Sequence, residues 1–398
     1  MECPVKQSET EIPHPAYEQI VEGSTLLLIP KLIESRGPAS TDMPVFYNPA
    51  MSINRDFSVL FFQSVSEIRK ALDGLAATGA RGIRIMNETT WEGEMHMNDF
   101  SPVAQKLMER NAELNSVDVT IHRKNLNTIL SEQYFDLIDI DPFGGPVDFV
   151  PQACTSIRNR GYLAITATDT GALCGSYPKP GLRRYGFRNG RSYLTHETGV
   201  RGLLGYAIRQ AAVHDRYLEP VLSQSINHYY RVVVRVINGA KIADRMLDEL
   251  TYVRLLPGGF EVVSREDRDK MPRNALLSPD SISSGQGSNR LLGPFYTGPL
   301  HSHDLLNEMS SHLSSLDLVH RSRIEKLLGL YLAETPTPPW FYDSDHVASH
   351  LGRSAPAIVR ILSAIQDKGY IAGPTQFSPT GFRTDAPRDI VFETFGTL

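Results

Sequence analysis

Short apolar runs alternate with stretches of helical periodicity between about residues 46 and 238 of the 398-residue chain. Phe135–Ile140 is apolar and β-branched, which is typical of a strand buried in a parallel sheet. Similar strand patterns occur at Ala71–Ala76, Met95–Asn98 and Tyr162–Thr166. Helical patterns begin at Ile83 and cover Leu203–Ala212. This alternation predicts an α/β fold with a doubly wound sheet.

The pattern changes beyond the last apolar strands. Val221–Ser223 and Tyr230–Val236 predict a closing hairpin, and Ser278–Gly287 is polar enough to be a mobile loop. Thr335–Pro339 has the composition of a stiff linker. We therefore expect two domains, a catalytic domain at residues 1–238 and a smaller α+β accessory domain at residues 239–398.

The end of the chain resembles a winged helix. Val347–Leu351 and Ala355–Ile365 predict two helices, and the segments around Gly369–Ala372 and Thr384–Pro387 predict a wing. Winged helices bind nucleic acids in some proteins and serve only for packing in others. Arg383 and Arg388 are the candidate RNA contacts of this module.

Composition narrows the class of protein. The chain is 41% apolar with a net charge of −5, and its only cysteines are Cys3, Cys154 and Cys174. These cysteines form no C-x-x-C pair, so we expect neither a structural zinc site nor a disulfide framework. No apolar run reaches the roughly 20 residues of a membrane span, and the N-terminus lacks a signal-peptide pattern. We expect a cytoplasmic protein.

The most informative motif follows the strand Phe135–Ile140 directly. It reads Asp141-Pro142-Phe143-Gly144-Gly145, at the end of a strand where α/β sheets bind ligands. A carboxylate two residues before an aromatic ring suits a flat heterocycle with an exocyclic amine, since the ring can stack and the carboxylate can accept amino hydrogens. The alternative is a plain turn, because Asp-Pro and Gly-Gly are common turn dipeptides.

Two upstream features favour a ligand-binding motif over a plain turn. Ala77-Thr78-Gly79-Ala80-Arg81-Gly82 forms a glycine turn before a predicted helix, and Asp99 ends the next predicted strand. Glycine lets the backbone approach a cofactor, and an acid at the second strand end can bind a ribose diol. The glycine spacing departs from G-x-G-x-x-G, which weighs against a nicotinamide-dependent dehydrogenase. The three features in this order fit an S-adenosylmethionine-dependent methyltransferase that acts on an amino nitrogen.

The chain resembles the tRNA (guanine(26)-N2)-dimethyltransferase family, and most of all its archaeal members. The matching stretches span roughly residues 44 to 235, with a weaker match at Leu292–Leu300. They are Phe46–Pro49, Asn54–Asp56, Thr78–Arg84, Asn98–Asp99, Arg110–Asn115, Asp139–Gly144 and His196–Arg201. The resemblance implies a class I (Rossmann-like) methyltransferase domain and dimethylation of guanine 26 in tRNA.

The resemblance also implies which residues hold the cofactor, S-adenosyl-L-methionine. They are Arg55, Gly79, Arg81, Asp99, Asn125 and Leu126. Asn125 stands where the family usually has an acid, and the second half of the chain lacks the paired zinc cysteines that family members often carry. The alternative for Arg55 is a salt bridge to Asp56 or another acid, and that for Asp99 is the N-cap of the next helix.

On the base side, Asp141 would orient the guanine amine and take up its proton, with a backbone carbonyl near Pro142 accepting the second N–H. Phe143 would stack on the base, and the resemblance places Phe46 on its opposite face. Asn48 is a further candidate for contact with the base. His196 and Glu197 are interpreted as a helix start with a core-facing histidine rather than as an acid–base pair.

An arginine-rich segment is the candidate RNA contact. Pro180–Arg191 interleaves Arg183, Arg184, Arg188 and Arg191 with two aromatics in a chain that is acidic overall. Arginine forks bind phosphates and aromatics stack on unpaired bases, whereas the alternative is a solvated loop.

We expect a tRNA-binding monomer that needs no metal and no membrane. Two other functions remain open from the residues: an amino methyltransferase for another base in RNA or DNA, and a non-catalytic tRNA-binding protein with the same fold.

Overall fold

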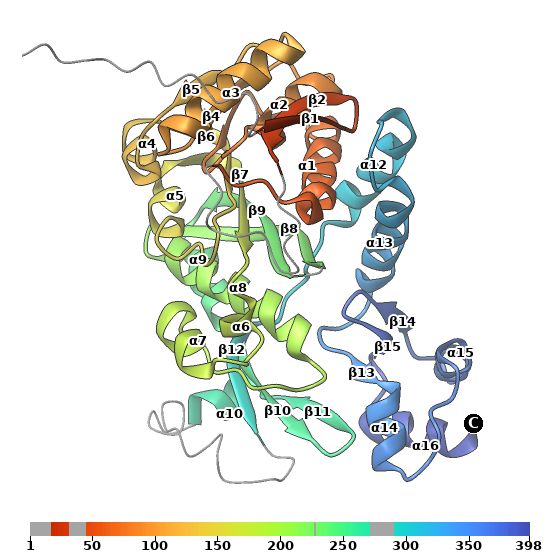
Figure 1. Ribbon diagram of the computed structural model, residues 1–398. Helices are drawn as coiled ribbons and strands as arrows, with labels where there is room; N and C mark the ends of the chain where they lie inside the picture. The colour runs from red at the N-terminus through yellow and green to blue at the C-terminus, as the bar shows by residue number, and fades with distance from the viewer. Residues whose placement is uncertain (1–16, 32–44, 227, 271–289) are drawn as a thin grey trace, which may run out of the picture. The chain divides into compact units, whose positions relative to one another are not determined.

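The computed structural model describes residues 17–31, 45–226, 228–270 and 290–398 (Figure 1). The protein divides into two compact units. The first takes in the chain up to Leu126 together with Ser315–His320, and the second takes in Asn127–Ser314 and Arg321–Leu398. The predicted domain boundary at residue 238 lies inside the second unit. Cys3 and the predicted loop Ser278–Gly287 lie outside the described residues.

The first unit contains three short parallel strands in the order β5-β4-β3 and an antiparallel hairpin, β1-β2. The strands predicted at 71–76 and 95–98 are confirmed as β3 and β4. The elements are β1 (Tyr17–Glu22), β2 (Thr25–Pro30), α1 (Ser52–Ser64), β3 (Lys70–Asp73), α2 (Ala80–Glu88), β4 (Glu94–Asn98), α3 (Pro102–Asn115) and β5 (Thr120–His122).

Two asparagines of α3 hold the β1-β2 hairpin by its backbone. Asn111 accepts a hydrogen bond from Leu28 N at 2.7 Å and donates to Leu28 O at 3.0 Å. Asn115 makes the same pair of bonds to Leu26, at 3.0 and 2.7 Å. Each asparagine side chain thus forms hydrogen bonds with both the N–H and the C=O of one residue of β2, as a neighbouring strand would. This is a structural reason for the two asparagines in the Arg110–Asn115 stretch.

The late segment Ser315–His320 completes this unit. The Ser52 hydroxyl lies 2.7 Å from His320 Nε2, and His320 N donates to Asp56 Oδ2 at 2.8 Å across 264 residues of sequence. Asp56 is fully buried and its other oxygen lies 2.8 Å from Arg84 Nη2. One oxygen of this buried carboxylate therefore accepts a hydrogen bond, and the other lies in an ion pair.

The second unit carries four strands in the order β6-β7-β9-β8, with β6 and β7 parallel and β9 antiparallel to both β7 and β8. The predicted closing hairpin is confirmed. Asp139 on β6 is buried and ion-paired to Arg231 of β9 at 2.5 Å, so its carboxylate links two strands of the sheet. The elements are β6 (Phe135–Ile140), α5 (Val150–Ser156), β7 (Ile157–Ala167), α6 (Thr170–Leu173), α7 (Pro178–Tyr185), α8 (Thr195–Ala212), β8 (Arg216–Ile226), β9 (Tyr229–Asn238) and α9 (Ala240–Asp248). A further helix, α4, runs from Leu126 to Glu132.

The rest of the second unit contains two small antiparallel sheets, β11-β10-β12 and β13-β15-β14. The second sheet, with α14 and α15, has the predicted winged-helix arrangement, and its wing is the β14-β15 hairpin. The elements are β10 (Leu250–Leu256), β11 (Gly259–Val262), α10 (Arg265–Lys270), β12 (Leu291–Tyr296), α12 (His303–His312), α13 (Arg321–Glu334), β13 (Tyr342–Asp343), α14 (Ser344–His350), α15 (Ile358–Asp367), β14 (Ala372–Thr375), β15 (Ser378–Thr384) and α16 (Arg388–Thr397).

Within the described ranges, no helix is long and apolar enough to cross a membrane, and no three His, Cys, Asp or Glu side chains are grouped so as to hold a metal ion.

Candidate active site

The glycine turn between β3 and α2 has the backbone geometry that the cofactor prediction requires. Gly79 has φ +77° and directly precedes α2. A Cβ at this position would lie 3.0 Å from Ile83 Cδ1 and 3.1 Å from Met108 Cγ. Only glycine adopts this left-handed conformation without strain. A side chain at this position would therefore be strained in its backbone and crowded against the core, while the turn leads directly into the positive end of a helix.

Asp99 lies at the end of β4 beside this turn. Its carboxylate accepts hydrogen bonds from Ala77 N at 3.1 Å and from Ser101 N at 2.9 Å. The N-cap of α3 is Ser101, whose hydroxyl accepts from Ala104 N, so the N-cap alternative for Asp99 is wrong. Asp99 is half-buried and oriented by two backbone donors, which leaves carboxylate lone pairs for a ligand.

Two predicted arginines are held by neighbouring side chains. Arg55 makes a bidentate contact with Glu22, at 2.7 and 2.6 Å, so the acid that it pairs with is Glu22 and not Asp56. Arg81 donates to the side chains of Asn54, at 2.7 Å, and Ser58, at 2.6 Å. Both arginines are buried. Their guanidinium groups are rigidly placed, and any contact with a cofactor would be additional to these bonds.

Glu22 is a site-region residue that the sequence patterns did not reveal. Burial by itself would raise the pKa of its carboxyl, but the hydrogen bonds and charges of Arg55 and Arg84 outweigh burial and lower that pKa to about 2. Tyr47 also donates to Glu22, at 2.6 Å. Glu22 is therefore ionised at neutral pH and fixes Arg55. Because Glu22 and Arg55 are 33 residues apart, no local sequence pattern indicates that they form a pair.

The remaining first-unit candidates lie in loops. Phe46 is half-buried beside the buried Tyr47, and Asn125 is exposed directly before α4, whose first residue, Leu126, is buried. Asn98 connects two of these loops, because its side chain donates to Gly74 O at 3.0 Å and accepts from Lys124 N at 3.1 Å. The loops after β3 and β5 are thus joined through one buried amide.

In the second unit, the loop after β6 presents a carboxylate and an aromatic ring. Asp141 is half-buried, Pro142 is buried, and Phe143 is 63% exposed although it is a large apolar side chain. Gly144 fixes the loop, since its N–H donates to the Thr168 hydroxyl at 2.7 Å and its carbonyl accepts from Thr168 N at 2.9 Å. The loop is thus held by the backbone of Gly144 and presents the phenyl ring to solvent.

Gly145 allows the next segment to approach this loop. A Cβ there would lie 2.9 Å from both Asp169 Oδ2 and the Tyr185 hydroxyl oxygen. Asp169 in turn accepts from Tyr185 at 2.5 Å and from Arg184 at 2.9 Å. The loop that carries Asp141 and Phe143 therefore packs directly against residues of the predicted RNA-contact segment.

That segment is not the loop predicted for Pro180–Arg191, because α7 occupies its first half. Arg183 and Arg191 are exposed, whereas Arg184 is ion-paired to Asp169. Arg188 is buried, and its backbone pairs with Gly293 of β12. A buried guanidinium cannot bind a phosphate on the surface, so Arg188 is not available for the predicted role.

Two other expectations need correction. His196 is exposed, and the core-facing residue of the pair is Glu197, which is fully buried and accepts from Arg201 and Arg383 at 2.8 Å each. Arg383 is therefore a buried ion-pair partner rather than an RNA contact. Arg388 donates to the carbonyl of Pro257 in the β10-β11 turn.

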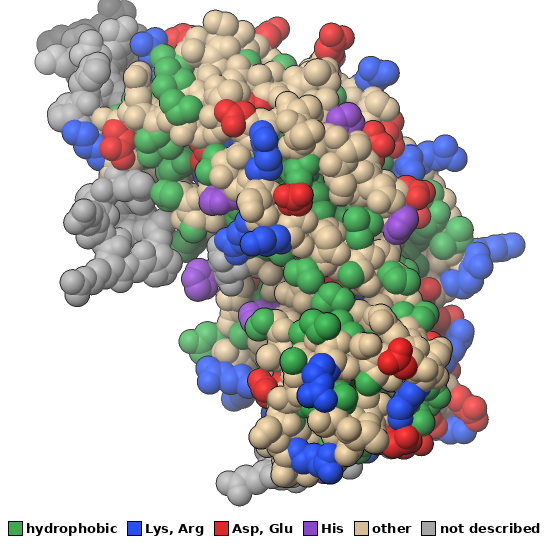
Figure 2. Space-filling model, turned by 90° about the vertical axis from the view of Figure 1, so that its right-hand side faces the viewer, with side chains coloured by type: hydrophobic (Ala, Val, Ile, Leu, Met, Phe, Trp, Pro, Cys, Tyr) green, Lys and Arg blue, Asp and Glu red, His purple; other side chains and the backbone are tan. Residues whose placement is uncertain are grey.

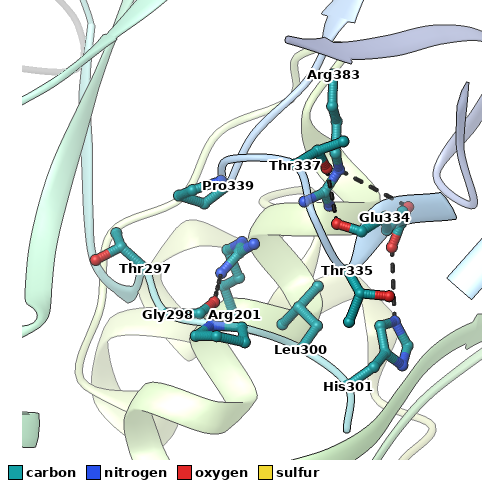
Figure 3. Close-up of a pocket in the computed structure, with 11 residues that line it drawn as sticks. Arg201, Thr297, Gly298, Leu300, His301, Glu334, Thr335, Thr337, Pro339 and Arg383 are labelled. Carbon is teal, nitrogen blue, oxygen red and sulfur yellow. Dashed lines mark hydrogen bonds and ion pairs between the residues drawn. The ribbon is translucent and has the colours of Figure 1, made fainter. Parts of the chain in front are cut away.

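The second unit also contains a cavity of about 110 Å³ that none of the expected cofactor or base residues lines (Figure 3). Arg201 points toward it from α8 and Arg383 from β15, and His301 and Glu334 lie 3.5 Å apart beside it. Burial alone would raise the pKa of Glu334, but Arg383 and hydrogen bonds from His301 and Thr375 lower it to about 2. The cavity lies within a buried network of ion pairs that connects α8, α13 and β15.

Comparisons with known proteins cover almost the whole chain. The family described as N2,N2-dimethylguanosine tRNA methyltransferase matches residues 23–395. The tRNA (guanine(26)-N(2))-dimethyltransferase of Thermococcus kodakarensis is 35% identical, covering 94% of this chain and 97% of the relative. That of Methanothermobacter thermautotrophicus is 34% identical, covering 92% and 95%. The solved structure of Trm1 from Pyrococcus horikoshii with S-adenosyl-L-methionine has a TM-score of 0.82 and 33% identity, covering 95% of this chain and 99% of that one.

Proposed function

This chain belongs to the N2,N2-dimethylguanosine tRNA methyltransferase family, and we propose from its own residues how it transfers methyl groups from S-adenosylmethionine to N2 of guanine 26 in tRNA. The observation that carries the proposal is the loop after β6, which holds the Asp141 carboxylate and the exposed Phe143 ring on a hydrogen-bonded support. The family match favours tRNA guanine over the other bases that an Asp-Pro-Phe loop could serve.

The first unit supplies residues that fit the cofactor. The left-handed glycine turn at Gly79, at the start of α2, suits close approach of the methionine part, and the oriented carboxylate of Asp99 suits a ribose diol. Arg55 and Arg81 would place positive charge toward the methionine carboxylate, with Asn125 and Leu126 toward the adenine. When bound, S-adenosylmethionine supplies an electrophilic methyl group on a positively charged sulfur.

We expect Gly79→Ala to lower the free energy of unfolding by about 1–2 kcal/mol, the cost of a left-handed backbone for a residue with a Cβ. If the free energy of cofactor binding is reduced by a similar amount, the affinity for S-adenosylmethionine falls about tenfold. Titration calorimetry measures this affinity. Gly329→Ala is the matched control, because nothing lies within 4 Å of a Cβ at this position in α13. Wild-type affinity in Gly79→Ala would contradict the assignment of this turn.

The second unit supplies residues for the base. The guanine amino group is a poor nucleophile, because its lone pair is delocalised into the ring. Asp141 would accept a hydrogen bond from that amine, orient it, and take up the proton that it loses when the N–C bond forms. Phe143 would stack on the guanine, with Phe46 as the second stacking candidate and the region of Pro142 as acceptor for the other N–H. Unstacking the guanine costs a few kcal/mol, which stacking on these rings would offset.

Two rounds of this reaction are chemically consistent with one carboxylate. Each transfer forms one N–C bond and releases one proton, and the monomethylated amine retains one hydrogen that Asp141 could again accept. The dimethylated product has no such hydrogen, so the reaction stops there.

The direct test is transfer of labelled methyl from S-adenosylmethionine to an unmodified tRNA transcript. We expect N2,N2-dimethylguanosine in the nuclease digest, and no label in a transcript whose guanine 26 is changed to adenine. Equal labelling of both transcripts would overturn the assignment of position 26. Labelling of duplex DNA in place of tRNA would favour an amino methyltransferase for another substrate.

For the RNA we propose phosphate contacts by Arg183 and Arg191. The winged helix is a weaker candidate, because each of its five Lys and Arg residues has an intramolecular partner. Arg353 and Arg360 donate to carbonyls at the end of α16, and Lys368 pairs with Glu393, while Arg383 and Arg388 are held as described. In the view of Figure 2, Lys and Arg are interspersed with Asp and Glu rather than gathered into one patch.

We expect Arg183→Ala to weaken tRNA binding and to reduce the slope of log affinity against log salt by about 1, because one phosphate contact is lost. Filter binding over a range of salt concentrations measures this slope. Arg360→Ala is the matched control and is expected to leave the slope unchanged. A larger effect of Arg360→Ala would instead assign the phosphate contacts to the winged helix.

A further inference from the structure

An exposed tyrosine lies in the segment that supports the base-binding loop. Tyr177 is 65% exposed and directly precedes α7. Its N–H donates to Gly171 O at 2.8 Å, and a Cβ on Gly171 would lie 2.6 Å from Cδ2 of the tyrosine ring. The ring therefore rests on the backbone of α6 in a defined position. Among the described residues, no other aromatic ring stacks on it.

The supporting contacts connect this tyrosine to the predicted base-binding loop. Thr168, at the end of β7, makes the hydrogen bonds that hold Gly144. Asp169 follows it and is held by Tyr185 and Arg184 of α7, where Gly145 approaches both Asp169 and Tyr185. Short α6 then leads to Tyr177, and α6 and α7 pack against each other (Figure 1). Phe143 and Tyr177 are thus exposed aromatic rings on two segments that are connected through Thr168, Asp169 and Tyr185.

The charges near this tyrosine favour nucleic acid as the ligand. Arg183 and Arg184 lie in the last turn of α7, which starts at the residue after Tyr177, and Arg191 Nε donates to the hydroxyl of Ser176 at 3.3 Å. An exposed aromatic ring among arginines is the combination by which proteins bind unpaired nucleotides, with the ring on the base and the guanidinium groups on the phosphates.

We propose that Tyr177 is a stacking platform for an unpaired nucleotide of tRNA adjacent to the target guanine. The proposal rests on the proposed function. When the guanine leaves its stack, the face of a neighbouring base loses its partner, and a tyrosine ring can replace that stacking without regard to base identity. Phe143 then receives the base that reacts, and Tyr177 holds a base that does not.

The test compares Tyr177→Ala, Tyr177→Phe and Tyr134→Ala. Tyr134 is the matched control, because it is 62% exposed in the same unit but precedes β6 and so lies at the opposite end of that strand. We expect Tyr177→Ala to raise the KM for tRNA by about tenfold to a hundredfold, the range of losing one base–aromatic stack. Tyr177→Phe and Tyr134→Ala should keep the wild-type KM, and all variants should keep the wild-type affinity for S-adenosylmethionine.

A spectroscopic measurement separates stacking from a general structural effect. Transcripts carrying 2-aminopurine at either neighbour of position 26 are bound to each variant, and fluorescence is recorded. We expect one of the two probes to stay quenched with wild type and Tyr177→Phe and to brighten with Tyr177→Ala. If wild type methylates tRNA while Tyr177→Ala behaves like Tyr134→Ala in both measurements, the stacking proposal is wrong. If wild type itself transfers no methyl to tRNA, the proposed function fails instead.

Discussion

Asp141→Ala is expected to lower the rate of methyl transfer to tRNA by roughly 10²- to 10⁴-fold, the usual contribution of a positioned general base. The carboxylate is the only acidic side chain of the Asp-Pro-Phe-Gly-Gly loop, and its substitution removes both the acceptor that orients the amine and the acceptor of the proton. Single-turnover kinetics with labelled S-adenosylmethionine measure the chemical step directly. The affinity for the cofactor, which we assign to residues of the first unit, should stay within about twofold of wild type.

Asp136→Ala is the matched control for this prediction. Asp136 lies on the same strand, β6, but near its start, where its carboxylate pairs with Arg158 at 3.1 Å. We expect its activity to equal that of wild type. If Asp141→Ala retained more than a tenth of the wild-type rate, another group would have to accept the proton, and the role assigned to Asp141 would be lost.

Arg383→Ala is expected to lower the free energy of unfolding by about 3–5 kcal/mol, the range for breaking a buried ion pair by removing one partner. Arg383 is buried and lies 2.8 Å from Glu197 and 3.8 Å from Glu334, both of which are buried. Without it, Glu197 keeps only Arg201 and the backbone N–H of Trp340 as donors. Two buried carboxylates would then share less positive charge.

Chemical denaturation measures this loss, with Lys368→Ala as the control. Lys368 pairs with Glu393 at 2.7 Å within the same winged helix, but both side chains are partly exposed, so we expect a loss of only about 0–1 kcal/mol. Equal losses in the two variants would mean that the buried network contributes no more than a surface pair. A further prediction follows for binding: Arg383→Ala should affect tRNA affinity only to the extent that it unfolds the protein.

Much of the base-binding loop could be predicted because its determinants are local. The apolar run ends at Ile140, as β6 does, and the proline and two glycines that follow cannot continue a strand of this kind. The same holds for Gly79, whose left-handed conformation is one that glycine adopts readily. The order of strands and turns along the chain was therefore enough to locate the glycine turn proposed for the cofactor and the loop proposed for the base. The roles of the individual residues stay predictions.

The partners of the arginines could not be predicted, because they depend on residues distant in sequence. Arg55 is paired with Glu22, 33 residues away, and Arg383 with Glu197, 186 residues away. An arginine-rich stretch has the same composition whether its side chains face water or the core. Arg183 and Arg188 differ in exposure only because the chain after α7 turns inward to pair with Gly293.

The place of Ser315–His320 in the first unit constrains how the protein is made. A ribosome synthesises α1 early, yet the backbone N–H that satisfies the buried Asp56 belongs to His320. The first unit therefore cannot complete its folding while it emerges, and must wait until most of the second unit has been translated. A chain that ends before residue 315 would leave that carboxylate short of one donor. The two units therefore do not follow one another along the chain, and neither corresponds to a fragment that a single cut in the gene could produce.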